Sequence, residues 1–185
     1  TGTNGKTSIV YFLYQFLLLL DKKVGMLSTI ENKIKDKSIS SSLTTPDPIE
    51  INKLMSEMIK MGIEYCVMEA SSHAIDQIRI SGSDIYVAIF SNISHDHLDY
   101  HKTFLNYINT KKKLFDQLSE NSFSVINTDD KRADYIVQNS KSEVINYSVR
   151  SISENKARII EKSVEGMLVE IDNQKVSLGV LGEFN

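Results

Sequence analysis

A short loop at the start of the chain, residues 1–8 with the sequence TGTNGKTS, constrains the fold more than any other segment. It joins glycines to a Gly-Lys-Thr sequence, and an apolar, helix-like run over residues 9–20 follows directly. A glycine-rich loop that begins a helix directs backbone N–H groups at one point, a lysine adds positive charge, and a threonine hydroxyl can bind Mg²⁺. The pattern therefore predicts a polyphosphate-binding loop, and a simple turn is the alternative.

The usual pattern of such loops contains one more glycine and follows a strand. That glycine would stand one residue before Thr1, so we expect the chain to be a piece of a longer protein. Its 185 residues are enough for one domain with a substantial core.

The composition favours an ordinary globular protein, with 41% hydrophobic and 24% charged residues. A net charge of −3 gives no electrostatic reason to expect nucleic acid or an anionic membrane as a partner. The apolar run over residues 12–20 is too short to span a bilayer, so no membrane partner is expected. The single cysteine, Cys66, lies in an apolar run, which predicts a buried structural thiol and fits a reducing cytoplasm.

Apolar stretches alternate with helical patterns through most of the chain. Residues 24–29, 65–68, 86–90 and 123–127 are predicted strands, and the second and third end at polar clusters, Glu69 to His73 and Ser91-Asn92. Helices are predicted over residues 5–20, 101–118 and 129–137, and another starts at Asp47-Pro48. This order predicts an α/β fold of the P-loop, Rossmann-like type, in which helices flank a mostly parallel sheet that binds ligands at the carboxyl ends of its strands.

Two regions depart from this alternation. Residues 31–43 are charged and then serine-rich, which predicts a mobile loop. Residues 157–162, 166–171 and 176–180 are predicted to form a small antiparallel region, with a tight turn at Asp172-Asn173.

Two polar clusters could carry chemistry. Glu69 ends a predicted strand, where a carboxylate would face the phosphate loop and could bind Mg²⁺. The segment over residues 94–101, SHDHLDYH, is the densest group of potential metal ligands. It is compatible with a dinuclear metallohydrolase, with a metal and nucleotide site shared with the loop, or with a solvated loop that caps helices.

Helical phase separates the three consecutive lysines of the predicted helix over residues 101–118. The apolar residues of that helix form one stripe: Phe104, Ile108, Phe115 and Leu118. Lys111 lies inside the stripe, Lys112 points to the side and Lys113 points the opposite way. Desolvation lowers the pKa of an inward-facing amine, so Lys111 could add CO₂ and become a carbamate, which is a carboxylate-like metal ligand. A lysine whose head group reaches water is the alternative.

Several motifs together resemble the central ATP-binding domain of the Mur ligase family. They are TGTNGKTS, TTPDP, MEASSHA followed by Gln77 and Arg79, SNISHDHLDYH with YINTKKKLF, and VINTDD. These motifs occur in the family's order over residues 1–130, and the final LGEFN resembles the edge of that domain.

The resemblance implies a site for ATP and two Mg²⁺ ions. It assigns ATP binding to Gly2, Thr3, Asn4, Gly5, Lys6, Thr7, Ser8 and Asn185. It assigns the metal ions to Thr7, Glu69, His97 and Lys111, the last as a carbamate. Lys6, His97 and Lys111 are the implied catalytic residues, with Lys6 on the β- and γ-phosphates.

The resemblance also implies the reaction, in which ATP phosphorylates the terminal carboxylate of UDP-MurNAc-L-Ala-D-Glu. The amine of meso-diaminopimelate or L-lysine then attacks the acyl phosphate. The implied substrate-binding residues are Thr44, Thr45, Ser71, Gln77 and Arg79. Residues 1–185 would be a central domain that lacks its first strand, the N-terminal UDP-binding domain and the C-terminal amino-acid-binding domain. We expect the protein to be a cytoplasmic monomer whose isolated central domain is inactive.

Other classes of function remain open at this point. A folylpolyglutamate synthetase shares the loop, but TTPDP and SSHA with Gln77 and Arg79 are not expected there. A non-catalytic P-loop module would need neither Thr44, Arg79 nor a buried lysine. The sequence does not determine which amino acid is added.

Overall fold

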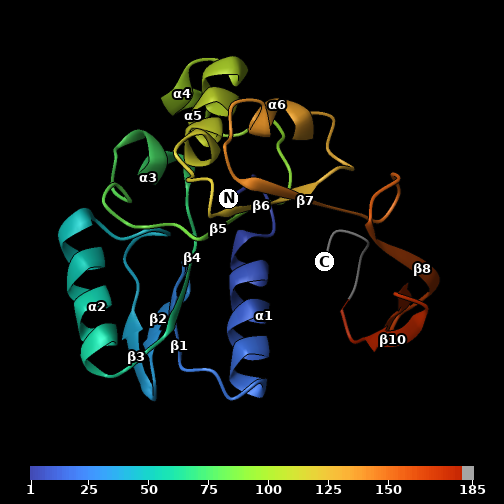
Figure 1. Cartoon of the computed structure of the whole chain (residues 1–185), viewed down its shortest axis with the longest axis horizontal. Helices are drawn as coiled ribbons and strands as arrows, with labels where there is room; N and C mark the ends of the chain where they lie inside the picture. The colour runs from blue at the N-terminus through green and yellow to red at the C-terminus, as the bar shows by residue number, and fades with distance from the viewer. Residues whose placement is uncertain (181–185) are drawn as a thin grey trace. The chain divides into compact units, whose positions relative to one another are not determined.

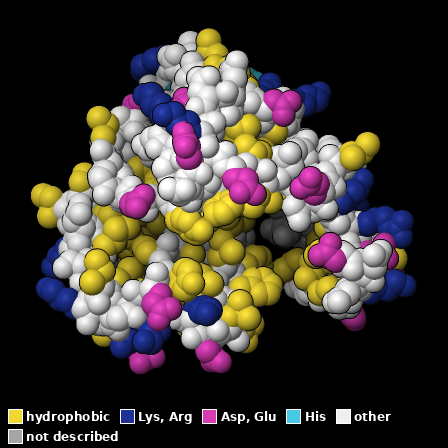
Figure 2. All heavy atoms as spheres, viewed as in Figure 1, with side chains coloured by type: hydrophobic (Ala, Val, Ile, Leu, Met, Phe, Trp, Pro, Cys, Tyr) yellow, Lys and Arg dark blue, Asp and Glu magenta, His cyan; other side chains and the backbone are white. Residues whose placement is uncertain are grey.

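The computed structural model describes residues 1–180, and the chain divides into two compact units. Unit 1 contains Thr1 and Lys6–Asp84, and unit 2 contains Gly2–Gly5 and the chain from Ile85 onward. Within the described residues, every helix is too short or too polar to cross a membrane. Lys and Arg side chains are interspersed with Asp and Glu on the face shown in Figure 2, as the small net charge leads one to expect.

Unit 1 is a four-stranded sheet with helices on both faces. Its elements in chain order are α1 (Lys6–Leu19), β1 (Val24–Leu27), β2 (Glu31–Ile34), β3 (Lys37–Ser40), α2 (Pro48–Lys60), β4 (Tyr65–Met68) and α3 (Ser72–Asp76). The strand order is β3-β2-β1-β4, in which β1 and β4 are parallel and the other pairs are antiparallel.

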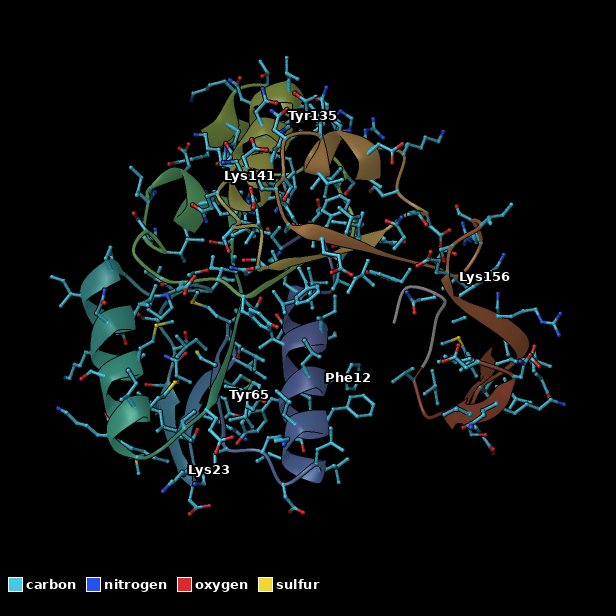
Figure 3. The ribbon with its side chains drawn as sticks, viewed as in Figure 1. Phe12, Lys23, Tyr65, Tyr135, Lys141 and Lys156 are labelled. Atoms are coloured by element: carbon cyan, nitrogen blue, oxygen red, sulfur yellow. The ribbon has the colours of Figure 1, made fainter. Side chains whose placement is uncertain are left out.

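Helices α1 and α2 cover opposite faces of this sheet (Figure 1). Val10 and Tyr14 of α1 pack against Val24 and Met26 of β1. On the other face, α2 contributes Leu54 and Met58 to a cluster with Leu27 and Ile34. The outer side of α1 remains apolar, and Phe12, 40% exposed, projects away from the helix (Figure 3).

The start of α2 follows the predicted capping pattern. The Asp47 carboxylate accepts hydrogen bonds from the backbone N–H groups of Ile49 and Glu50, both at 2.9 Å, and Pro48 occupies the first helical turn. These contacts satisfy donors that a helix start otherwise leaves unpaired.

The prediction of a mobile loop over residues 31–43 was wrong, because β2 and β3 form a hairpin there. Asn32 and Ile34 face inward and are fully buried, while Lys35 adopts a left-handed φ of 52° in the turn. The inward residue Asn32 is polar, so the alternation of a strand was hidden in the sequence.

Cys66 also differs from the prediction. It lies on β4, at the edge of the unit 1 sheet, and is exposed rather than buried. Enough protein nevertheless surrounds the sulfur that burial raises the pKa of the Cys66 thiol to about 12. The thiol is therefore protonated and unreactive at neutral pH.

Unit 2 contains the larger sheet. Its elements are β5 (Val87–Phe90), α4 (Leu98–His101), α5 (Phe104–Asp116), β6 (Phe123–Asn127), α6 (Ala133–Val137), β7 (Glu143–Ser148), β8 (Asn155–Ser163), β9 (Gly166–Ile171) and β10 (Gln174–Leu178). The strand order is β10-β9-β8-β7-β6-β5. Strands β5 to β8 pair in parallel, and β8 to β10 pair antiparallel, which confirms the predicted fold class.

Several predicted boundaries in unit 2 were wrong. The helix predicted over residues 101–118 begins only at Phe104 and ends at Asp116, and a turn at Lys102 with φ 69° and ψ −43° separates it from the short helix α4. The helix over residues 129–137 begins only at Ala133, and β10 begins at Gln174 instead of 176. The turn at Asp172-Asn173 is confirmed by φ angles of 51° and 63°.

Candidate functional site

The first half of the predicted phosphate loop belongs to unit 2, where residues 91–94, which we call the support segment, hold it. The backbone N–H of Thr3 donates to the Asn92 carbonyl at 2.9 Å, and that of Asn4 donates to Asn92 Oδ1 at 3.0 Å. The amide of Asn92 donates in return to the Asn4 carbonyl at 3.1 Å. Ser94 N–H donates to Thr3 Oγ1 at 2.9 Å.

These contacts define what the start of the loop can do. The backbone N–H groups of Thr3 and Asn4 already have protein acceptors, so they shape the loop instead of facing a ligand. A Cβ at Gly2 would lie 1.9 Å from Ser91 Oγ, so only glycine fits this close approach. Gly5 has a φ of 82°, a conformation that glycine adopts without strain.

The second half of the loop begins α1 in unit 1, where Thr7 contacts a buried carboxylate. The Thr7 hydroxyl donates to Glu69 Oε2 at 3.0 Å, and the backbone N–H of Thr29 donates to Glu69 Oε1 at 2.7 Å. Glu69 directly follows β4 and is 1% exposed. The predicted magnesium ligands Thr7 and Glu69 are therefore adjacent at the N-terminus of α1.

The predicted substrate residues of unit 1 form a network that also reaches Glu69. The Thr45 hydroxyl donates to the Glu69 carbonyl at 2.7 Å, and the Ser71 N–H donates to Thr45 Oγ1 at 3.1 Å. Arg79 Nη1 donates to the Thr45 carbonyl at 3.0 Å. Arg79 Nε donates to Gln77 Oε1 at 2.8 Å, and Thr44 is the half-buried neighbour of Thr45.

The guanidinium of Arg79 thus already donates hydrogen bonds to other residues of the protein when no substrate is bound. Its contacts with Gln77 and with the Thr45 carbonyl orient these two residues. The N–H groups that these bonds do not use could still meet a carboxylate. Binding of a substrate carboxylate by Arg79 stays a prediction.

Lys111 in α5 is buried, as helical phase predicted. It is 1% exposed, its Nζ donates to the Gly2 carbonyl at 2.8 Å, and it lies 4.8 Å from the centre of the Tyr107 ring. Lys113 is exposed, but Lys112, predicted at the side of the helix, is also buried and pairs with Asp116. The prediction for Lys112 missed that α6 packs against α5, with Tyr135 close to the Lys112 ammonium.

Tyr107 connects Lys111 with the loop and with His97. Its hydroxyl lies 3.1 Å from Thr3 Oγ1, and the His97 ring packs edge-on against it with centroids 6.2 Å apart. Burial raises the pKa of Tyr107, and the hydrogen bond with Thr3 offsets part of this rise. The phenol therefore stays neutral at physiological pH. His97 has a left-handed φ of 51°, and its Nε2 lies 3.4 Å from Asp96 Oδ2.

The dinuclear metallohydrolase hypothesis finds no support in the side-chain arrangement. Within residues 1–180, no three His, Cys, Asp or Glu side chains gather as a metal-binding group. His95 instead stacks on Phe104, with ring centroids 4.2 Å apart. Pairs such as Thr7 with Glu69 suit Mg²⁺ better, because this ion usually takes few protein ligands and completes its shell with water and phosphate oxygens.

Sequence reasoning missed the residues that hold the loop. Asn92 was noted only as the polar end of a strand, Ser94 only as the start of the segment over residues 94–101, and Asp130 only as part of a motif. Strands β5 and β6 are parallel neighbours, so the polar residues that follow them meet at one edge of the sheet. This property of parallel sheets could have predicted that Asp130, after β6, lies near residues 91–94, after β5. The predicted nucleotide contact Asn185 lies outside the described residues.

Comparisons with known proteins agree with this geometry. Residues 1–185 match the model of the Mur ligase middle domain. A Bacteroides fragilis protein named UDP-N-acetylmuramoyl-L-alanyl-D-glutamate–2,6-diaminopimelate ligase is 48% identical over 185 residues, which are 100% of this chain and 38% of that protein. A Cytophaga hutchinsonii protein of the same name is 45% identical, with the same coverage. A solved structure of an enzyme of this name superposes with a TM-score of 0.85 at 28% identity, over 99% of this chain and 39% of that one. The chain therefore spans little more than a third of the length of these relatives.

Proposed function

Since this chain belongs to the Mur ligase middle-domain family, we propose that it forms the ATP-binding part of a ligase that joins 2,6-diaminopimelate to UDP-MurNAc-L-Ala-D-Glu. The names of the relatives at 48% and 45% identity support this activity and favour diaminopimelate over L-lysine. Because the chain covers 38% of those relatives, we assign the uridine end of the substrate and the incoming amino acid to other parts of the protein.

The observation that carries this proposal is the position of Glu69 between two sets of residues. Its carboxylate accepts a hydrogen bond from the Thr7 hydroxyl at the phosphate loop, and its backbone carbonyl accepts one from the Thr45 hydroxyl in the substrate network. A ligase that transfers a phosphoryl group to a carboxylate needs its nucleotide residues and its acceptor residues side by side. A module that only binds nucleotide needs no such network.

The residues of the chain fit ATP and Mg²⁺. Lys6 is the first residue of α1, where a positive side chain and the helix N-terminus both favour phosphate, and Ser8 follows in the same turn. Thr7 and Glu69 would hold one Mg²⁺, and His97 with Lys111 would contribute to a second. ATP with its metal ions supplies the phosphoryl group and balances the charge of the triphosphate against the acceptor carboxylate.

Lys111 would act as a carbamate in this proposal. The neutral Nζ forms a bond to the carbon of CO₂ and releases one proton to solvent, which leaves a carboxylate-like group on a secondary nitrogen. That nitrogen keeps one hydrogen, so it can still donate to the Gly2 carbonyl, which it contacts at 2.8 Å. The surrounding burial excludes water and favours a single position for the modified side chain.

The acceptor carboxylate would lie with Thr44, Thr45, Ser71, Gln77 and Arg79. Arg79 contributes positive charge to the acceptor, and Ser71 and Thr45 contribute hydroxyls that already contact each other at 3.3 Å. Attack of the amine on the acyl phosphate gives a tetrahedral intermediate from which phosphate leaves. We place the enzyme in the cytoplasm, where ATP is available, and we propose that it is a monomer.

One assay tests the activity directly. In the natural protein that contains this chain, release of ADP should require both UDP-MurNAc-L-Ala-D-Glu and 2,6-diaminopimelate, and L-lysine should replace the latter poorly. Turnover that ignores the muramoyl substrate would refute the ligase, and a preference for L-lysine would refute only the choice of amino acid. Folylpolyglutamate synthetase, the earlier alternative, predicts turnover with a folate acceptor instead.

A further inference from the structure

The carboxylate of Asp130 has no part in the chemistry proposed above, yet it is tied to the support segment. It lies in unit 2, shortly after β6, and its Oδ2 accepts a hydrogen bond from the backbone N–H of Ile93 at 2.7 Å. Its Oδ1 accepts the backbone N–H of Arg132 at 2.9 Å. Asp130 therefore links the turn after β6 with the middle of the segment that holds the phosphate loop.

Ile93 stands between the two residues that contact the loop most. Asn92 accepts hydrogen bonds from the backbone N–H groups of Thr3 and Asn4, and the Ser94 carbonyl accepts one from the Thr3 hydroxyl. The N–H of Ile93 belongs to the same planar peptide unit as the Asn92 carbonyl, so a bond that fixes this N–H also orients the carbonyl that accepts the N–H of Thr3. A second bond, from Asn127 Nδ2 to the Ser91 carbonyl at 2.6 Å, fixes the start of the same segment.

We propose that Asp130 is a positioning residue for the nucleotide: through residues 91–94 it holds Thr3 and Asn4 in the shape that the phosphate loop needs to bind ATP. This inference rests on the proposed function. A loop that must find its bound shape loses affinity, because only a fraction of the molecules is competent to bind at any moment. Carboxylates that orient a site from the outside typically matter by about 10- to 100-fold.

The neighbouring carboxylate, Asp129, is a matched control within the same motif. It also binds backbone N–H groups, those of Val149 at 2.7 Å, Ser151 at 2.6 Å and Arg150 at 3.1 Å. These donors belong to the turn between β7 and β8. Removal of Asp129 changes the charge by the same amount as removal of Asp130 and removes at least as many backbone hydrogen bonds, but at a different part of the unit.

The test compares Asp130→Ala with Asp129→Ala in the natural protein that contains this chain. We would measure the dissociation constant of a fluorescent ATP analogue with Mg²⁺, and the exchange of the Thr3 and Asn4 amide hydrogens without nucleotide. Asp130→Ala should weaken nucleotide binding at least about tenfold and speed both exchanges, whereas Asp129→Ala should change neither by more than about twofold. Asp130→Asn, which keeps one acceptor oxygen, should lie between the wild type and Asp130→Ala, and it replaces the alanine variant if that variant does not fold.

The outcomes separate this inference from the proposed function. If the wild type binds the analogue and Asp130→Ala binds it equally well, the inference is wrong and the proposed function stands. Equal losses in both alanine variants would also refute it, because they would indicate a general loss of stability. If the wild type binds no nucleotide, the proposed function fails. If the amide hydrogens of Thr3 and Asn4 exchange at the same rate in Asp130→Ala as in the wild type, Asp130 does not position the loop and the inference is wrong.

Discussion

In unit 1, candidate side chains such as Thr7 and Glu69 bind each other directly, whereas Lys111, Asp129 and Asp130 of unit 2 bind backbone groups. Thr7 reaches the Glu69 carboxylate directly, and Arg79 reaches Gln77 in the same way. In unit 2, Lys111 donates to a backbone carbonyl, and Asp129 and Asp130 accept backbone N–H groups. Unit 1 thus places reactive groups next to each other, and unit 2 fixes the shape of its own backbone. Substitutions should therefore affect chemistry and metal binding in unit 1, and conformation in most of unit 2.

Lys111 is the residue of unit 2 whose replacement should affect the chemistry instead of the conformation, and we expect the largest effect there. Lys111→Ala should lower kcat on the order of 1,000-fold, because in the proposed function the carbamate of Lys111 is a metal ligand. Short carboxylates such as acetate should restore part of the activity if they occupy the place of the carbamate. Lys113→Ala, at an exposed position of the same helix, should remain active. Full activity of Lys111→Ala would mean that no carbamate takes part in the reaction, and Lys111 would then follow the rest of unit 2 in having only a structural role.

In unit 1, Glu69 should be the most sensitive position. Glu69→Gln keeps the shape of the side chain but removes its negative charge and replaces one carboxylate oxygen by an NH₂ group, which cannot bind Mg²⁺. We expect a loss of about 10- to 100-fold in kcat/KM. Raising the Mg²⁺ concentration should recover part of it, as a titration would show.

Glu64→Gln, on the exposed segment before β4, serves as the control for Glu69. It should leave both the activity and the Mg²⁺ dependence unchanged. A Glu69→Gln enzyme with normal Mg²⁺ dependence would mean that the contact with Thr7 is structural.

Carboxylates that bind backbone N–H groups and carboxylates that bind side chains should also differ in how much their charge stabilises the fold. Burial by itself would raise the pKa of Asp129, but hydrogen bonds from Val149, Ser151 and Arg150 bring it below its ordinary value of 3.8. In unit 1, a side-chain hydrogen bond from Ser38 lowers the pKa of Glu31, with a further contribution from Lys33. A lowered pKa stabilises the fold above the ordinary pKa, and this stabilisation is lost as the pH falls through the folded value.

Asp129→Asn should therefore lower the free energy of unfolding at pH 7 by on the order of 1 kcal/mol, and the difference from wild type should shrink as the pH falls below about 3.8. Glu31→Gln should cost less, because the Ser38 hydroxyl and the Lys33 ammonium can turn to water, whereas ordered N–H groups cannot. Denaturant titrations at several pH values measure both. A larger effect at Glu31 than at Asp129 would contradict the distinction between side-chain and backbone contacts.

The sequence predicted those parts of the fold that depend on neighbouring residues. The Asp47 cap and the turn at Asp172-Asn173 are local, because the side chain and the groups it serves lie within a few positions. The inward position of Lys111 followed from helical phase alone. The hairpin of β2 and β3 was missed, because its inward residue Asn32 is polar although it is fully buried.

The candidate site divides in the same way. Glu69 and Thr7 could be expected to meet, because parallel strands end at the edge where the phosphate loop lies. The link from Asp130 to Ile93 joins residues 37 positions apart, and no local pattern marks the N–H of Ile93 as the one that needs a carboxylate. Lys112 was misplaced for a related reason, since its burial depends on α6, a later segment of the chain. Residue types and spacing therefore predict where ligands can lie, but not which backbone groups hold them there.

The smallest predicted effect concerns two lysines with positive φ, one in each unit. Lys35 in the β2–β3 turn has a φ of 52°, in the left-handed region that ordinary residues visit at modest cost. Lys102, between α4 and α5, combines φ 69° with ψ −43°, and the N–H of Thr103 donates to the His101 carbonyl at 2.8 Å across it. This is the geometry of a γ-turn, which is strained for any residue with a Cβ.

Lys102→Gly should therefore raise the free energy of unfolding by about 1 kcal/mol, although it removes the contact of the lysine with the Asp99 carbonyl. Lys35→Gly should change stability by less than about 0.5 kcal/mol, because relief of the smaller strain is offset by the greater freedom of glycine in the unfolded chain. Thermal unfolding of the two variants measures the difference. If Lys102→Gly is instead destabilising, the turn at Lys102 carries no strain, and the contact of the lysine with the Asp99 carbonyl matters more than its backbone conformation.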